Sequence, residues 1–257
     1  MIAELRDRKA LVTGAGAGGM GATIAAVLAA QGADVALADI DCARAAEVAE
    51  AISDVETLVV ELDVASAESV ERAFASVLGR WGRLDVLVNN AGIGGGDSDW
   101  EPILRVNLLG TVRCTEAALR GMRERRYGKI VNIASIAGHS ARGTNGAYSV
   151  SKAAVLRYTK GLAVEVAPFS INVNAVCPGA VWTQMQSGPF ARPEEVDPRL
   201  AGLEPYEAFL EYYRPITPLA RPQTAEEVGK AVAFLASDDA ANITGQCLHV
   251  DGGAVRD

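Results

Sequence analysis

The chain has 257 residues, which is enough for one α/β domain with a substantial buried core. Its hydrophobic fraction of 49% and charged fraction of 22% are typical of a folded globular protein and exclude an intrinsically disordered one. The formal net charge at pH 7 is −8. Because nucleic-acid backbones require a basic protein surface, this charge argues against a nucleic-acid partner.

The cysteines and the amino-terminal sequence indicate the cellular setting. The cysteines are widely separated and form no CxxC pair, so their spacing predicts neither a disulfide framework nor a metal site; they are Cys42, Cys114, Cys177 and Cys247. The segment MIAELRDRKALVTG lacks the apolar region of a signal peptide, and no apolar stretch approaches the ~18 residues of a membrane span. We therefore expect a cytoplasmic protein without a membrane segment or a metal.

Strand and helix patterns alternate along the chain. Apolar, β-branched runs predict strands at KALVTG, ADVALAD, TLVVELDV, LDVLVNN, GKIVNIAS, SINVNAV and QCLHVD. Helical periodicity predicts helices at 22–31, 41–51, 67–79, 104–125, 148–166 and 224–237, the last opened by a capping box of Thr224 and Glu227. Alternation of this kind, with strands apolar on both faces, predicts a doubly wound α/β fold with a parallel sheet, in one domain spanning 1–257.

One segment near the carboxyl terminus has a different composition. Seven of the ten prolines lie within 189–222, together with the aromatic residues Phe190, Tyr206, Phe209, Tyr212 and Tyr213. The segment follows the carboxyl end of a strand, where ligand sites of α/β sheets form, so we expect a substrate lid at about residues 183–218. The alternative is an irregular surface loop or a subunit contact.

Glycines follow the first strand in the segment TGAGAGGMG at 13–21, immediately before an alanine-rich helix. Glycine lets the backbone approach a pyrophosphate, and the helix N-terminus offers N–H donors to its negative charge. We therefore expect Gly14, Gly18 and Gly19 to bind the phosphates of a dinucleotide.

The second strand ends in Asp39, 25 residues after Gly14, where a carboxylate can accept hydrogen bonds from the adenosine ribose. The same carboxylate would repel the 2′-phosphate of NADP, and no lysine or arginine occurs between Lys9 and Arg44 to counter it. The pattern therefore predicts NAD. The alternative is that Asp39 only caps the following helix, a task that Asp41 could perform instead.

Polar and small residues end the third and fourth strands at the same rim of the sheet. Asp63, followed by Val64, could accept the adenine amino group. Asn90, Ala91 and Gly92 follow the fourth strand, and the small pair would let a cofactor lie against the strand ends.

A third pattern predicts chemistry. Tyr148 lies thirteen positions after Ser135, and Lys152 lies four positions after Tyr148, one helical turn away on the same face. A neighbouring cation can lower a phenol pKa from about 10, which would allow Tyr148 to exchange a proton with an alcohol. A lone Tyr-x-x-x-Lys often arises by chance, so the prediction depends on Ser135 and on the glycine segment.

Taken together, these motifs resemble the short-chain dehydrogenase/reductase family over essentially the whole chain. The resemblance rests on 13–21, Asp63, 89–92, Asn107, Ser135, Tyr148, Lys152, Pro178-Gly179 and the ending ITGQCLHVDGG. It implies a Rossmann fold whose seven parallel strands have the order 3-2-1-4-5-6-7. It also implies a homo-oligomer, commonly a tetramer.

The resemblance also implies residue roles. Tyr148 would be the general acid/base, with its pKa lowered by Lys152, which would also bind the nicotinamide ribose; Ser135 would hold the substrate oxygen. Asn107 would kink a helix and hold a water that links Lys152 to solvent; the less favoured alternative is a polar helix residue that caps a neighbour. The remaining cofactor positions implied are Met20 at the pyrophosphate and Pro178, Gly179, Val181 and Thr183 beside the carboxamide.

Two features depart from the family pattern. The glycine segment is one residue longer than usual, which leaves open whether Gly18 or Gly19 is the middle glycine. Asn107 lies only seventeen positions after Asn90, fewer than expected for the family, so the open side of the substrate pocket should be wider or differently shaped.

The sequence therefore predicts an NAD-dependent dehydrogenase or ketone reductase for a secondary alcohol, with a cyclic or aryl-bearing substrate. Predicted substrate contacts, besides Ser135 and Tyr148, are Ala137, Asn145, Trp182 and Met185; His139 is interpreted as a surface or packing residue. One alternative is a 3-oxoacyl thioester reductase, which Asp39 disfavours because such reductions usually draw on NADPH. Another is a non-catalytic NAD-binding module, which would not require Ser135, Tyr148 and Lys152 together.

Overall fold

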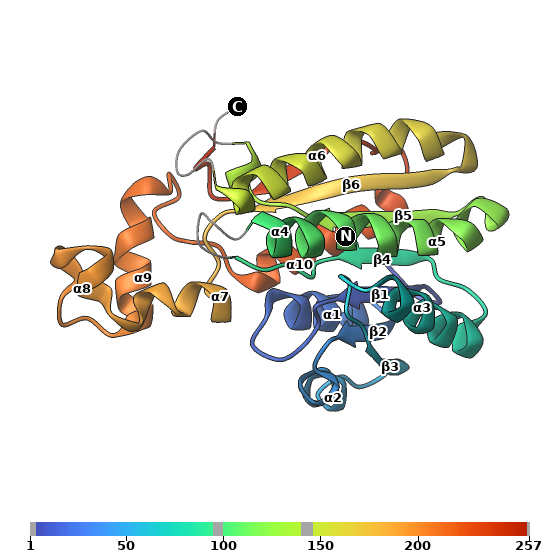
Figure 1. Ribbon diagram of the computed structural model, residues 1–257, viewed down its shortest axis with the longest axis horizontal. Coiled ribbons are helices and arrows are strands. Elements are labelled where there is room, and N and C mark those ends of the chain that lie inside the picture. The colour runs from blue at the N-terminus through green and yellow to red at the C-terminus, as the bar shows by residue number, and fades with distance from the viewer. Residues whose placement is uncertain (1–3, 95–99, 140–145, 256–257) are drawn as a thin grey trace.

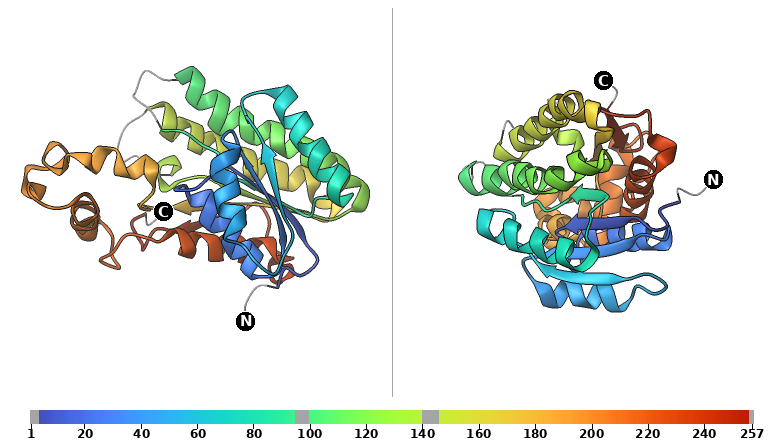
Figure 2. Two further views of the ribbon diagram at one scale, coloured as in Figure 1. Left: turned by 90° about the horizontal axis from the view of Figure 1, so that it is seen from below. Right: turned by 90° about the vertical axis from the view of Figure 1, so that its right-hand side faces the viewer.

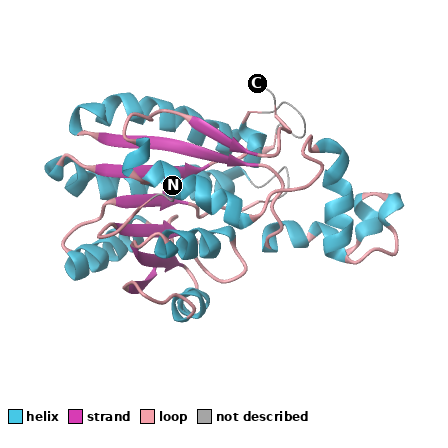
Figure 3. Cartoon of the chain, turned by 180° about the vertical axis from the view of Figure 1, so that it is seen from behind, coloured by secondary structure: helices cyan, strands magenta, loops and turns pink. Residues whose placement is uncertain are grey.

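A computed structural model describes residues 4–94, 100–139 and 146–255. Seven strands form one sheet in the order β3-β2-β1-β4-β5-β6-β7, and every neighbouring pair is parallel (Figure 3). They are β1 (Lys9–Thr13), β2 (Asp34–Asp39), β3 (Thr57–Glu61), β4 (Val86–Asn89), β5 (Gly128–Ile133), β6 (Ile171–Pro178) and β7 (Cys247–Val250). The predicted doubly wound fold and strand order are confirmed.

Helices cover both faces of the sheet (Figure 2). One face packs against α1 (Met20–Ala30), α2 (Cys42–Glu50) and α10 (Ala225–Ala236), and the other against α3 (Ala67–Trp81), α5 (Thr111–Arg125) and α6 (Ala147–Val166). The predicted capping box opens α10: Thr224 Oγ1 accepts from Glu227 N at 3.2 Å, and Glu227 Oε2 accepts from Thr224 N at 2.9 Å. Among the described residues, no helix has the length and apolar character that crossing a bilayer requires.

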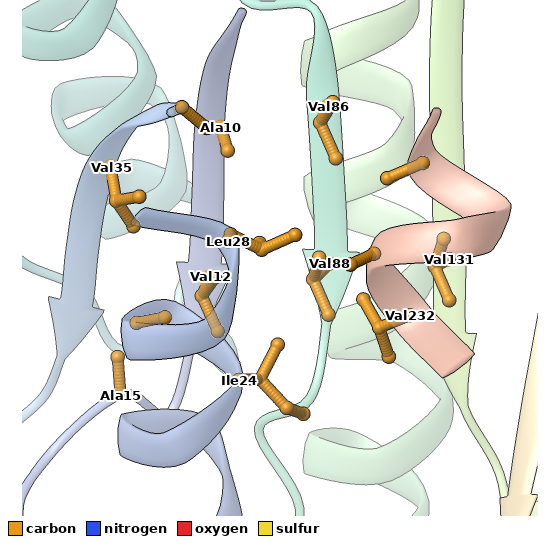
Figure 4. Close-up of a cluster of buried hydrophobic side chains, with 14 of the residues drawn as sticks. Ala10, Val12, Ala15, Ile24, Leu28, Val35, Val86, Val88, Val131 and Val232 are labelled. Carbon is orange, nitrogen blue, oxygen red and sulfur yellow. The ribbon is translucent and has the colours of Figure 1, made fainter. Parts of the chain in front are cut away.

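Alternation along the central strands divides the core into two layers. Val86 and Val88 of β4 lie with Ile24 and Leu28 of α1, whereas Leu87 between them lies with the helices of the opposite face (Figure 4). All five side chains are fully buried, and each contributes about 1.5–3 kcal/mol relative to exposure. This double burial explains why the strands read as continuous apolar runs.

The helix predicted at 104–125 has different boundaries and an interruption. It begins with α4 (Trp100–Leu104), continues through a π-helical turn, η1 (Arg105–Gly110), and then becomes α5. The predicted start at Leu104 was wrong: Trp100 is already helical, and Pro102 is tolerated because it lies in the first turn, where its missing N–H costs no hydrogen bond. Close packing explains the glycine that ends this turn, since a Cβ at Gly110 would lie 2.7 Å from Val64 Cγ2.

The proline-rich segment forms a helical projection beyond the carboxyl ends of the strands (Figure 1). It contains α7 (Gln184–Ser187), α8 (Pro193–Val196) and α9 (Pro205–Tyr213). Short 3₁₀ turns lie at Pro189–Ala191, Pro198–Leu200 and Arg214–Ile216 in this segment, and elsewhere at Ile136–Gly138 (η2), Ala167–Phe169 and Asp238–Ala240. Several of these elements begin with proline, whose fixed φ suits a first helical residue. The segment is therefore largely helical.

A hydrogen-bonded joint connects the ends of β1 and β4. Thr13 is buried, and its Oγ1 accepts from Asn90 N at 3.0 Å and from Ala91 N at 2.9 Å. Asn90 Nδ2 in turn donates to the carbonyls of Thr13 at 2.9 Å and Gly14 at 3.0 Å. The strand order reverses between β1 and β4, so this joint holds the two loops where an α/β sheet binds ligands.

Thr13→Val should lower the free energy of unfolding by about 2 kcal/mol, because two partly buried N–H groups lose their acceptor. Thr13→Ser is the matched control: it keeps the acceptor and loses one methyl group, at a cost of about 1 kcal/mol or less. Urea unfolding of the three proteins measures the difference. Equal losses in both variants would show that the methyl group, and not the hydroxyl, stabilises the joint.

Candidate active site

A cavity of about 650 Å³ lies at the carboxyl ends of the strands. The glycine loop and Asp39 line one part of it, and Ser135, Tyr148 and Lys152 line another. The predicted cofactor residues all line it: Gly14, Gly18, Gly19, Met20, Asp39, Asp63, Val64, Asn90, Ala91, Gly92, Tyr148, Lys152, Pro178, Gly179, Val181 and Thr183. Residues distant in sequence therefore meet at one site because parallel strands end at one rim.

The glycine loop leaves no room for a side chain at Gly14 or at Gly21. A Cβ at Gly21 would lie 2.1 Å from the carbonyl oxygen of Gly14, and one at Gly14 would lie 2.9 Å from Ala91 Cα. Gly18 has φ +80°, which disfavours other residues, whereas Gly19 has ordinary φ and is the N-cap of α1. The two candidate glycines thus have different tasks: Gly18 makes the turn, and Gly19 begins the helix.

Asp39 lies at the cavity and does not cap α2. Its Oδ2 accepts from Gly16 N at 2.7 Å, and its Oδ1 accepts from Asp41 N at 3.0 Å. Asp41 is the N-cap of α2, since its Oδ1 accepts from Ala43 N at 3.1 Å and from Arg44 N at 3.2 Å. The capping alternative for Asp39 is therefore wrong.

Arg44 is a cavity residue that sequence reasoning missed. Its guanidinium extends from α2 and donates to the carbonyl of Ala17 and to Gln184 Oε1, the latter at 2.8 Å. Gln184 N also donates to the carbonyl of Gly18 at 3.2 Å. These bonds join α2, the glycine loop and α7. The available signal was the position of Arg44 in the first turn of the helix that leaves Asp39.

The predicted hydroxyl, phenol and ammonium meet as expected from their spacing. Ser135 caps η2, where its Oγ accepts from Ala137 N at 3.1 Å, and its hydroxyl is hydrogen-bonded to the phenol of Tyr148. Lys152 is buried, and its Nζ donates to the carbonyl of Ile133 at 2.8 Å. The ammonium lies 5.7 Å from the centroid of the Tyr148 ring.

Burial dominates the protonation of both groups. It raises the pKa of Tyr148, which the hydrogen bond from Ser135 only partly opposes. Burial also lowers the pKa of Lys152 from 10.5 to about 8. Desolvation therefore outweighs any lowering of the phenol pKa in this structure, where the ammonium donates to backbone; the lowering of that pKa by Lys152 stays a prediction.

Asn107 occupies the π-helical turn beside this group. Its Oδ1 accepts from Ile93 N at 2.8 Å, and its Nδ2 donates to Ser151 Oγ at 3.0 Å. Ser151 Oγ donates to the carbonyl of Tyr148 at 2.6 Å. A Cβ built on Gly92 would lie 3.3 Å from Asn107 Oδ1 and 3.4 Å from Lys152 Nζ. Asn107 therefore holds the strand β4 loop against α6, next to the ammonium.

The predicted substrate contacts are only partly brought together. Ser135, Tyr148 and Met185 line the cavity, and Met185 is 46% exposed. Trp182 does not line it and instead packs with its ring centroid 5.1 Å from that of Phe209. Ala137 also lies outside the lining, and Asn145 lies outside the described residues.

The proline-rich segment after Trp182, called the insertion below, explains why Trp182 does not line the cavity. Its aromatic side chains form a cluster of their own, including Trp182, Phe190, Phe209 and Tyr213, with Phe190 and Phe209 buried. Only its first residues line the cavity among the described ones: Thr183, Gln184, Met185 and Gln186. Other lining residues were also missed: Gly16, Ile40, Leu62, Val106, Ile133 and Ala134. Each of these residues lies at or just after a strand end, or in a helix beside the rim, and that position could have indicated a place in the cavity lining.

The residues fit a nicotinamide dinucleotide. The N-terminus of α1 has no acidic residue in its first turn, and it follows a loop in which a side chain at Gly14 would collide with Ala91. A carboxylate, Asp39, lies beside that loop, and an ammonium and a phenol lie across the cavity. These groups match a pyrophosphate, a ribose and the reacting end of the cofactor respectively.

Comparisons with known proteins agree over the full length. A family model described as enoyl-(acyl carrier protein) reductase matches residues 14–255. A 3-oxoacyl-(acyl-carrier-protein) reductase of Aquifex aeolicus is 37% identical over 98% of this chain and 99% of its own. Levodione reductase of Leifsonia aquatica is 34% identical over 96% of this chain and 94% of its own.

A crystal structure of levodione reductase is also similar, with a TM-score of 0.86 and 33% identity, covering 97% of this chain and 98% of that one. Sequence, fold and site therefore lead to one assignment. The chain belongs to the short-chain dehydrogenase/reductase family of oxidoreductases.

Proposed function

We propose that this protein moves hydride between NAD and a secondary alcohol or ketone, with a cyclic or aryl-bearing substrate. The observation that supports it most is the meeting of Ser135, Tyr148 and Lys152 in one cavity with Asp39. Binding alone would not require the first three residues together. Interconversion of an alcohol and a ketone has a use for all three, because a proton must move at the substrate oxygen as the carbon is reduced or oxidised.

When bound, the nicotinamide supplies or accepts the hydride. Tyr148 donates a proton to the substrate oxygen during reduction and takes one during oxidation. Because burial raises its pKa, the phenol is protonated at neutral pH and is ready to donate. Ser135, hydrogen-bonded to the phenol, positions the substrate oxygen, and the Lys152 cation stabilises the phenolate that forms.

The mouth of the cavity supports a substrate with an apolar body. Ile93 is 38% exposed and Met185 is 46% exposed, and both line the cavity. Gly94 lies against Met185, where a Cβ would contact its sulfur at 3.6 Å. A flat ring suits such a surface better than a polyol, which would leave its hydroxyl groups without partners.

Asp39 supports NAD over NADP. Its carboxylate lies in the cavity and already accepts two backbone N–H bonds, so the negative charge is fixed in place. A 2′-phosphate beside it would meet like charge. Arg44 lies nearby, but its guanidinium is engaged by Ala17 and Gln184.

A second candidate is reduction of a 3-oxoacyl thioester. The name of the Aquifex aeolicus relative favours it, and the cavity would accept the same carbonyl chemistry. Turnover of acetoacetyl thioesters with NADPH, at rates above those for cyclic ketones with NADH, would establish this candidate over the first.

Self-assembly into a homo-oligomer, with a tetramer as the favoured state, is part of the proposal. Three apolar side chains are exposed on η1 and α6: Leu109 at 45%, Val150 at 41% and Val164 at 78%. Helices that bear such side chains can pack against those of a second copy.

Tyr148→Phe should lower kcat by about 10²–10⁴, because the variant has no proton to give or take, while the Kd for NAD changes little. Tyr158→Phe is the matched control, since it removes a phenol from the same helix at a distance from the cavity. Steady-state kinetics and cofactor titration measure both. Near-normal turnover by Tyr148→Phe excludes the proposed role, and tight NAD binding without turnover by the wild type indicates a binding module.

Asp39→Ser should raise the ratio of kcat/KM for NADP over that for NAD by at least about tenfold, or about 1.4 kcal/mol. Asp41→Ser is the control, because it removes a neighbouring charge while serine still caps α2. Assays of a panel of cyclic, aryl and aliphatic alcohols with both cofactors supply the wild-type ratio. A wild-type preference for NADP contradicts the proposed cofactor.

Lys152→Met should stabilise the protein at pH 7 by up to about 3 kcal/mol while it lowers activity. The folded pKa is about 8 against 10.5 ordinarily, so the unfolded chain binds the proton more tightly. Wild-type stability therefore rises as pH increases from about 8 to 10.5, and the advantage of the variant shrinks over that window. Urea unfolding at pH 7, 9 and 10 tests this, with Lys160→Met as the exposed control; an advantage independent of pH contradicts it.

A further inference from the structure

A group of sulfur and imidazole side chains lies at the edge of the sheet outside the cavity. Cys177 on β6 pairs directly with His249 on β7, and Cys247 precedes His249 by two residues. Side chains two apart on a strand point to one face. Cys177 and Cys247 contact the same apolar cluster as Val155 of α6, which places this group on the α6 face of the sheet.

His139 reaches the same place from η2. It follows this turn directly, four residues after Ser135. Its ring centroid lies 4.6 Å from that of His249, with the ring planes at 87°. One nitrogen of each histidine and Sγ of Cys177 lie within 4.8 Å of one another. Cys247 adds a fourth donor, because its thiol is hydrogen-bonded to that of Cys177.

Burial shields this group from water. Cys177 has no exposed surface, and the other three side chains are partly buried. Nε2 of His249 is enclosed and has no hydrogen-bond partner within the described part of the chain. An enclosed imidazole nitrogen that makes no hydrogen bond destabilises the folded protein, unless another ligand such as a metal ion binds it.

The donor set is one that zinc prefers. Zn²⁺ takes four tetrahedral ligands from thiolate sulfur and imidazole nitrogen at about 2.0–2.3 Å, which places donors about 3.3–3.8 Å apart. The ligand atoms of His139, Cys177 and His249 lie within 4.8 Å of one another, so they need to approach by only about 1–1.5 Å to reach this spacing. Hard cations such as Mg²⁺ are disfavoured because no carboxylate belongs to the group.

We propose that His139, Cys177 and His249 bind a structural Zn²⁺, with Cys247 as the fourth ligand. Each thiol releases its proton to solvent as its sulfur binds, and no electron is transferred. The ion joins η2 to the β6–β7 edge. Ser135 is the N-cap of η2 and His139 is its C-cap, so zinc bound to His139 would fix the position of the turn that carries the Ser135 hydroxyl.

The test uses the full chain without an affinity tag, stripped with a chelator and titrated with ZnCl₂ or CoCl₂ alone. We expect roughly one ion per chain by calorimetry and elemental analysis, with release of protons into weak buffer. Co²⁺ should give the visible absorption of a tetrahedral site and a near-ultraviolet thiolate-to-cobalt band. An octahedral spectrum, or binding without the thiolate band, overturns the proposal.

Variants identify the ligands. His249→Gln and Cys247→Ser should each weaken zinc binding by at least about tenfold, and Cys177→Ser should abolish the thiolate band most completely. Cys42→Ser, which removes a half-buried thiol on α2, is the control and should bind normally. Circular dichroism establishes that each variant is folded. Unchanged zinc affinity in His249→Gln and Cys247→Ser contradicts the site. Absence of zinc binding by the wild-type protein in reducing buffer, where Cys177 and Cys247 are both thiols, contradicts it as well.

Discussion

The joint between Thr13 and the Asn90–Ala91 segment is the constraint on which the rest of the site depends. Four hydrogen bonds hold the loops after β1 and β4 together at the point where strand order reverses. Gly14 can then approach Ala91 closely, and Gly21 can approach the Gly14 carbonyl. A side chain at either glycine would separate the loops. The cavity exists because these two connections meet backbone to backbone, leaving space above them for a ligand.

Burial then determines the chemistry that the cavity can perform. Lys152 is almost fully enclosed and is stabilised by the Ile133 carbonyl, so its cation survives at neutral pH only with a depressed pKa. The same desolvation keeps Tyr148 protonated. A buried acid beside a buried cation costs stability, and natural active sites retain such groups because charge at the reacting atoms changes during catalysis. Asn107 and Ser151 hold the surrounding backbone and do not enter the cavity.

Sequence predicts what depends on local spacing and strand ends. The apolar runs that alternate with helical segments predicted the parallel sheet. The four-residue spacing of Tyr148 and Lys152 predicted that both lie on one face of a helix. The sequence could not predict that Arg44 lines the cavity. Its long side chain crosses from α2 to the glycine loop, and that contact depends on how the helix and the loop lie in the folded chain. Trp182 was misplaced because aromatic residues of the insertion bury one another. The His139 and Cys177 contact arises from strand register and a turn, with no spacing in the sequence to indicate it.

The insertion and the longer glycine loop are structurally connected, which bears on specificity. The Gly18 carbonyl accepts from Gln184 N, so the lengthened loop positions the first turn of the insertion. Beyond that turn, the aromatic cluster supports itself at a distance from the cavity. Substrate contacts should therefore come from Met185 and its neighbours in α7, across from Ile93, and not from the aromatic rings. The glycine loop and Arg44 hold α7 in place through Gln184, because a short helix of four residues has little stability of its own.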